Sequence, residues 1–160
     1  MNFREGWIVV VGDWEKTRAH TDLRHETAHQ ALCALTPDRF PPFWLSEGIA
    51  TLFESGADDN GRPKPNPPRR RNAARLVGWR RRIRLSGLID RHRPAYINAD
   101  AYARSWALTI HLAQNNPHAL RHFLKVWQSK NLSPGETFVQ TVLADTQLEQ
   151  LEQAVSTTMR

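Results

Sequence analysis

The chain has 160 residues, of which 40% are hydrophobic, and its 22 Lys and Arg against 16 Asp and Glu give a net charge of +6. This length suggests one domain over residues 1–160 with a substantial core, although the chain could be a piece of a longer protein. The single cysteine excludes an internal disulfide framework, and no apolar run approaches the ~18 residues of a membrane helix. Because the N-terminus lacks a signal-peptide pattern, the chain as written is expected to be cytoplasmic.

The first predicted element is a buried strand over residues 6–12, where a β-branched apolar run lies between two glycines. Residues 2–5 before it could form the stub of a second strand or a frayed terminus. A largely apolar helix is predicted over 22–35, because Pro37 follows and cannot continue it. After a stiff, proline-containing connector, a second helix is predicted over 43–55.

The helix over 22–35 contains the sequence His-Glu-x-x-His at residues 25–29. An α-helix turns about 100° per residue, so His25 and His29 lie roughly 40° apart, one turn apart on one face. Two imidazole nitrogens can then converge on one metal ion, with Glu26 beside the ion rather than on it. The alternative is a surface helix with two solvated histidines. The apolar neighbours of these histidines argue against that alternative, because buried histidines need partners.

Residues 44–50, in the second predicted helix, read Trp-Leu-Ser-Glu-Gly-Ile-Ala and place Glu47 18 positions after His29. Together the two segments resemble the gluzincin, or peptidase-MA-like, zinc metallopeptidases. The second is similar to the corresponding stretch of aminopeptidase N relatives, with Ser46 and Ile49 substituted. The resemblance implies one Zn²⁺ held by His25, His29 and Glu47, with Glu26 as the general base that takes a proton from water.

A third segment, residues 100–108, resembles the stretch that carries the aminopeptidase tyrosine. This resemblance implies that Tyr102 donates a hydrogen bond to the oxyanion formed during hydrolysis, whereas the simpler interpretation is a core tyrosine in an amphipathic helix. Other residues could also supply this donor; they are Tyr96, His92, His111, His118 and His122.

Two departures from the family pattern limit what can be carried over. Thermolysin-like relatives have an aspartate four residues after the ligand glutamate, where this chain has Thr51. The carboxylate that orients a ligand histidine must therefore come from elsewhere, and Glu54, Asp22 and Asp100 are the candidates. The motif with which aminopeptidases bind a free amine is also absent, so an endopeptidase is more consistent with the sequence than an exopeptidase.

The rest of the chain is predicted to be a flexible Pro- and Arg-rich loop over residues 56–72 followed by helices. These helices are expected over residues 72–86, 99–115, 117–130, 134–144 and 145–157. Asn98 or Asp100 can cap the second of them, Pro117 suits a first turn, and Ser133 begins a capping-box sequence. The predicted fold class is therefore α+β and mostly helical, with a zincin-like core.

Eight arginines fall between Arg69 and Arg84. They indicate either a solvated helix face or a surface for nucleic acid, anionic membrane or acidic substrates, but no nucleic-acid-binding motif accompanies them. The sequence as a whole predicts a zinc metallopeptidase acting on a peptide or protein, without nucleic acid as a partner. The alternatives are a metal-binding domain without proteolytic activity, and a basic nucleic-acid or membrane adaptor with a vestigial site.

Overall fold

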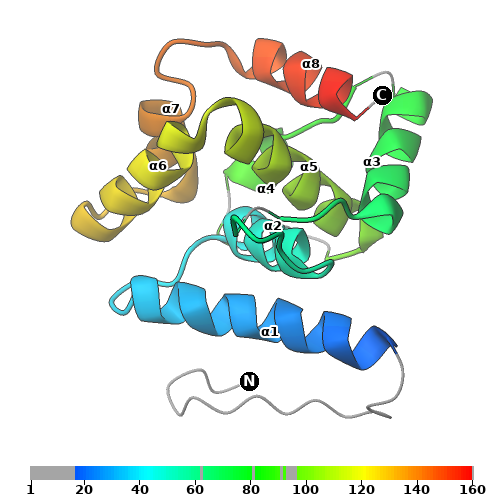
Figure 1. Ribbon diagram of the computed structural model, residues 1–160. Coiled ribbons are helices and arrows are strands. Elements are labelled where there is room, and N and C mark those ends of the chain that lie inside the picture. The colour runs from blue at the N-terminus through cyan, green and yellow to red at the C-terminus, as the bar shows by residue number, and fades with distance from the viewer. Residues whose placement is uncertain (1–16, 62, 81, 91, 93–96, 160) are drawn as a thin grey trace.

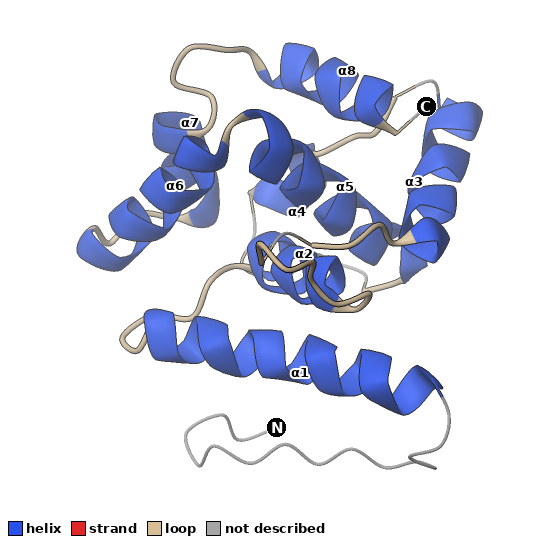
Figure 2. Cartoon of the chain, in the orientation of Figure 1, coloured by secondary structure: helices blue, strands red, loops and turns tan. Residues whose placement is uncertain are grey.

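The computed structural model describes residues 17–61, 63–80, 82–90, 92 and 97–159. In this part of the chain every regular element is a helix, as Figure 2 shows, so the mostly helical class is confirmed there. The predicted strand over residues 6–12 lies outside the described residues, as does its possible stub. No described helix has the length and apolar character needed to cross a membrane.

Eight helices follow one another along the described residues (Figure 1): α1 (Thr17–Leu35), α2 (Phe43–Phe53), α3 (Pro67–Arg80), α4 (Ser86–Ile89), α5 (Ala99–Asn115), α6 (Pro117–Ser129), α7 (Pro134–Thr141) and α8 (Leu148–Thr158). Most agree with the predicted ranges to within a few residues, but α1 begins at Thr17 instead of the predicted 22, and α3 ends at Arg80 instead of the predicted 86. The short α4 was missed, because four residues are too few to produce a helical periodicity.

The predicted loop over residues 56–72 is wrong at its C-terminal end. Helix α3 already begins at Pro67, and the predicted start of 72 is five residues late. Prolines are tolerated in a first turn, where the backbone N–H has no partner inside the helix. The side chain of Asn66 accepts a hydrogen bond from the backbone N–H of Arg69 and so satisfies one of the free donors at this end.

The predicted caps of the C-terminal helices are confirmed. The Asn98 side chain accepts from the backbone N–H of Ala101 and begins α5. Pro117 lies in the first turn of α6, and Ser133 forms a capping box with Glu136 at the start of α7. These local bonds explain why the helix boundaries in this region could be predicted.

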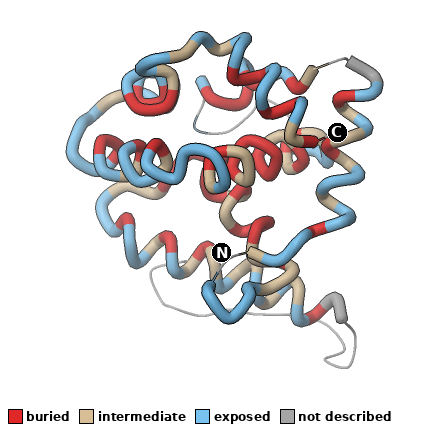
Figure 3. The backbone as a smooth tube through the Cα atoms, turned by 45° about the horizontal axis from the view of Figure 1, so that its top comes forward, coloured by how far each residue is buried: buried red, intermediate tan, exposed pale blue. Residues whose placement is uncertain are grey.

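Helix α5 is central in the fold, and α2 packs against it on one side and against α1 on the other (Figure 1). Buried positions are concentrated along these central helices, as Figure 3 shows. The fully buried Trp44 of α2 contacts Phe123 and Phe138 edge-on, with ring centroids 5.1 and 5.4 Å apart. This aromatic cluster ties α2 to α6 and α7, so the helix that carries Glu47 is held from several sides.

Candidate metal centre

His25 and His29 project from one face of α1, as their spacing predicts. Their Nε2 atoms lie 3.2 Å apart, and their ring centroids are 4.9 Å apart. His29 is buried and His25 is half-buried, which excludes the alternative of two solvated histidines. Both imidazoles therefore present the same ring nitrogen to one point between α1 and α2.

The third predicted ligand comes from α2, which packs across α1. Glu47 Oε2 lies 3.2 Å from His25 Nε2 and 3.5 Å from His29 Nε2. This oxygen is buried and accepts no hydrogen bond of good geometry from the described residues. A buried carboxylate oxygen beside two imidazole nitrogens is an arrangement that a cation would complete.

The separations of these three atoms fit a metal ion. Zinc bonds nitrogen and oxygen ligands at about 2.0–2.2 Å, and in a tetrahedral site two such ligands lie about 3.3–3.6 Å apart. The observed separations of 3.2, 3.2 and 3.5 Å agree with this range to about 0.1 Å. His25, His29 and Glu47 form a group of three residues that could hold a metal ion, which leaves a fourth tetrahedral position for another ligand.

Each histidine has a hydrogen-bond partner on its other ring nitrogen. His25 Nδ1 lies 3.1 Å from Glu54 Oε1, so Glu54, one of the three predicted carboxylates, occupies this position. His29 Nδ1 lies 3.0 Å from the buried hydroxyl of Ser46. This contact of Ser46 was not predicted from the sequence, although the place of Ser46 next to Glu47 on the same helix was a usable signal. Such partners fix the imidazole orientation and direct Nε2 toward the metal position.

Other predicted carboxylate positions have different roles. Asp100 pairs with Arg104 within α5, at 3.8 Å. Thr51 occupies the position where thermolysin-like gluzincins carry an aspartate, and its hydroxyl donates to the backbone carbonyl oxygens of Glu47 and Gly48. Glu54 lies about one turn further along the chain and supplies the carboxylate instead.

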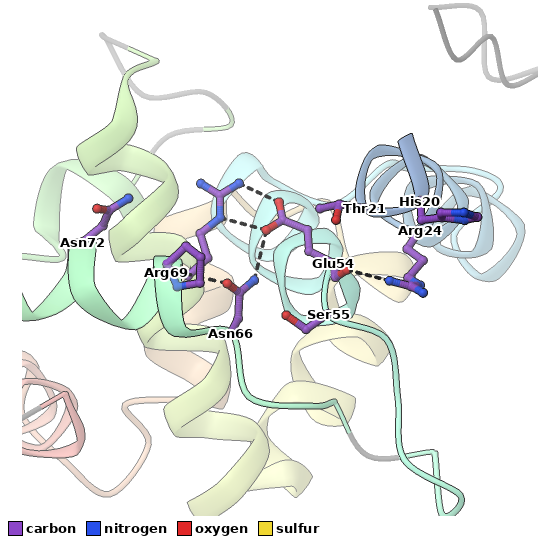
Figure 4. A pocket seen from close by; sticks show the side chains of 9 residues that line it. His20, Thr21, Arg24, Glu54, Ser55, Asn66, Arg69 and Asn72 are labelled. Carbon is purple, nitrogen blue, oxygen red and sulfur yellow. Dashed lines mark hydrogen bonds and ion pairs between the residues drawn. The ribbon is translucent and has the colours of Figure 1, made fainter. Parts of the chain in front are cut away.

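Glu54 is itself held by residues from the start of α3, as Figure 4 shows. Arg69 donates from Nη2 to Glu54 Oε1 at 2.6 Å and from Nε to Glu54 Oε2 at 2.9 Å. Asn66 Nδ2 donates to Oε2 at 3.0 Å. These residues line a polar pocket of about 530 Å³ that also includes Arg24 of α1. Arg69 and Asn66 fall in the predicted flexible loop over residues 56–72, and no site role was predicted for them.

The charges of this cluster compensate one another in the metal-free protein. Burial by itself would lower the pKa of His25, but the Glu47 and Glu54 carboxylates outweigh it and raise that pKa to about 9. Burial likewise opposes ionisation of the two carboxyl groups. The neighbouring imidazoles nevertheless lower the pKa of Glu47 to about 2, and His25 with Arg69 lowers the pKa of Glu54 to about 2. A proton on His25 thus supplies positive charge where a cation would bind.

Tyr102 of α5 lies near the cluster, with the Arg69 guanidinium carbon 5.7 Å from the centroid of its ring. Burial raises the pKa of its phenol, and the charges of Glu47 and Glu26 raise it further, while Arg69 lowers it. The ring packs edge-on against Phe43 with centroids 5.5 Å apart. Its hydroxyl is therefore protonated at neutral pH and can donate a hydrogen bond within electrostatic reach of both glutamates.

The other candidates for the oxyanion donor contact other parts of the protein, and one lies outside the described residues. His92 lies beside Trp127, with ring centroids 5.9 Å apart. His111 Nδ1 bonds the hydroxyl of Thr158 on α8. His118 and His122 lie beside each other on α6 with centroids 6.1 Å apart, and Tyr96 is outside the described residues.

Comparison with known proteins places this site within a family. A family model described as "Protein of unknown function (DUF1570)" matches residues 19–133, more than two-thirds of the chain. The chain belongs to the DUF1570 family. No curated protein and no solved structure matches it.

The DUF1570 match covers the complete cluster described above. Both histidines, Glu47, Glu54, Arg69 and Tyr102 lie within its limits, whereas α7 and α8 lie beyond residue 133. The metal-binding group is therefore part of the region that defines family membership. The family description assigns no activity, so the function must be inferred from the site.

Proposed function

We propose that this DUF1570 protein is a zinc-dependent metallopeptidase that hydrolyses peptide bonds, and that it acts as an endopeptidase. The observation that carries the proposal is the triangle of His25 Nε2, His29 Nε2 and Glu47 Oε2, with sides of 3.2, 3.2 and 3.5 Å. Two imidazoles and one carboxylate form a ligand set that suits Zn²⁺ and keeps one position open. Structural zinc sites instead have four protein ligands, whereas the described residues bring three together here, which favours a catalytic site.

A zinc ion in this triangle would polarise a substrate carbonyl and lower the pKa of a coordinated water to about 7. Glu26 follows His25 in α1 and is half-buried, so its carboxylate can take the proton of the attacking water. Glu26 then passes this proton to the leaving amine. Tyr102 donates its phenolic hydrogen to the oxyanion that develops from the carbonyl oxygen.

Several arginines of residues 69–84 form ion pairs within the protein, which weakens the alternative of a basic adaptor. Arg69 pairs with Glu54, while Arg82 and Arg84 approach the buried carboxylate of Glu152 at 3.6 and 4.0 Å. Their charges are partly neutralised inside the fold and are not all displayed to an anionic partner.

The experiment that tests the proposal compares wild-type protein with Glu26→Gln and His29→Ala. Zinc content is measured by mass spectrometry, and cleavage is measured with a quenched-fluorescence peptide library. Glu149→Gln is the matched control, because that carboxylate is exposed on α8. We expect about one zinc in wild type, in the control and in Glu26→Gln, little zinc in His29→Ala, and cleavage only by wild type and the control.

Each contrary outcome has a distinct meaning. Full activity of Glu26→Gln would contradict the role of Glu26 as general base. Stoichiometric zinc without cleavage of any peptide would favour the metal-binding domain without proteolytic activity. Salt-dependent binding of nucleic acid or anionic vesicles that survives removal of zinc would favour the basic adaptor.

A further inference from the structure

The arginines of residues 69–84 differ in their surroundings, although the sequence presents them as one basic segment. Arg70, Arg71 and Arg75 are exposed on α3. Arg82 and Arg84 lie near the buried Glu152 of α8. Arg69, in contrast, is half-buried and reaches the carboxylate that contacts a candidate metal ligand.

Arg69 contacts Glu54 in the strongest geometry available to such a pair. Two nitrogens of one guanidinium donate to the two oxygens of one carboxylate, at 2.6 and 2.9 Å. The Glu54 side chain is only 9% exposed, so water screens this interaction weakly. A fork of two parallel hydrogen bonds fixes the plane of the carboxylate as well as its position.

The fixed carboxylate in turn determines how His25 is oriented. Glu54 Oε1 lies 3.1 Å from His25 Nδ1, and an ionised carboxylate can only accept a hydrogen bond. The Nδ1 atom therefore keeps its proton, and Nε2, which faces His29 and Glu47, is the nitrogen that gives up its proton when a metal binds. Without Arg69, Glu54 would keep one hydrogen bond from a neutral side chain, the bond from Asn66 Nδ2 to Oε2. A single hydrogen bond does not prevent the carboxylate from rotating about that contact.

We propose that Arg69 is a positioning residue of the metal centre, which acts through Glu54 to hold His25 in its ligating orientation. The proposal rests on the metal-binding part of the proposed function and not on the peptidase reaction. It assigns a role in the site to the first arginine of the basic segment and leaves Arg70 and Arg71 as surface charges. Loss of a partner that orients a metal-ligating histidine commonly weakens metal binding by about 10- to 100-fold.

The test is a double-mutant cycle on the full chain with the zinc dissociation constant as its readout, measured by chelator competition on metal-free protein. Arg69→Met is compared in the wild-type background and in the Glu54→Gln background. Arg70→Met is the matched control, because it removes the same charge from an adjacent exposed position. We expect Arg69→Met to weaken zinc binding about 10- to 100-fold in wild type but less than about threefold in Glu54→Gln.

Other results would overturn the proposal. Zinc binding by Arg69→Met within about twofold of wild type would show that the arginine does not act on the metal site. An equal loss in both backgrounds would show that it does not act through Glu54. If Arg69→Met fails to fold, judged by its helical circular dichroism, Arg69→Lys replaces it, since lysine keeps the charge but cannot form the fork. Failure of wild type itself to bind zinc would instead refute the proposed function.

Discussion

Gly48 is the position where the structure makes its sharpest prediction about stability. It lies in α2 directly after Glu47, where α2 crosses α5. A Cβ atom at this position would lie 2.0 Å from Thr109 Oγ1 and 2.8 Å from the Ser105 carbonyl oxygen. The close approach of the two helices therefore depends on the absence of a side chain at residue 48.

The size of the effect follows from these distances. The Thr109 hydroxyl can rotate away, but two contacts cannot be relieved in this way. The Ser105 carbonyl oxygen belongs to the backbone of α5 and would have to retreat by about 0.6 Å to reach an ordinary contact of 3.4 Å, and Thr109 Cβ, at 2.9 Å, is fixed to the same helix. Overpacking of this kind destabilises by about 1–3 kcal/mol or more. Three atoms lie closer than 3.0 Å, which places the cost at the upper end of this range, about 3 kcal/mol. The higher helix propensity of alanine than of glycine offsets about 1 kcal/mol, so we expect Gly48→Ala to lower the free energy of unfolding by about 2 kcal/mol. The shift of α2 also moves Glu47, which should weaken zinc binding.

The measurement is urea unfolding of the metal-free protein followed by circular dichroism. Gly78→Ala in α3 is the control, because a Cβ there would meet nothing within 4 Å and should raise stability by up to about 1 kcal/mol. Adding Thr109→Ala to Gly48→Ala should restore part of the loss, since it removes the shortest contact but leaves the contacts with the Ser105 carbonyl oxygen and with Cβ of residue 109. If Gly48→Ala unfolds at the same urea concentration as wild type and binds zinc equally well, the close-packing argument is wrong.

Four further predictions concern the residues of the site. Ser46→Ala removes the hydroxyl 3.0 Å from His29 Nδ1 and should weaken zinc binding about 10-fold by chelator competition, with Ser55→Ala as the control. Tyr102→Phe should lower kcat about 100-fold or more with little change in zinc content, and unchanged kcat would exclude the phenol as the oxyanion donor. Because the pKa of His25 is raised to about 9 in the metal-free protein, zinc binding at pH 7.5 should release a proton, which calorimetry in buffers of different ionisation enthalpy measures. The raised pKa of His25 also predicts that the stability contributed by its charged form is complete below pH 6.5 and is lost as pH rises through about 9. The lowered pKa values of Glu47 and Glu54 predict the opposite dependence: their contribution is present above pH 4.5 and is lost as pH falls toward 2.

Local sequence information was sufficient for most of the helices and for part of the site. Caps at Asn98 and Ser133, together with Pro117, mark helix starts through bonds between near neighbours in the chain. The prolines before residue 72 predict a loop, whereas in the structure they lie in the first turn of α3 with Asn66 as its cap, where they permit a helix.

The spacing of His25 and His29 was enough to predict that they share one helix face, because helical periodicity is a local property of the backbone. Motif resemblance added Glu47 as their partner, and the distances of 3.2 and 3.5 Å agree with that prediction. The carboxylate that orients His25 can be identified from the packing of the helices but not from the sequence. Three candidates were open in the sequence, and Glu54 occupies the position because α2 packs across α1 and the start of α3 brings Arg69 to it. Such contacts join segments far apart in the chain, and their formation depends on how the helices pack rather than on any spacing within one helix.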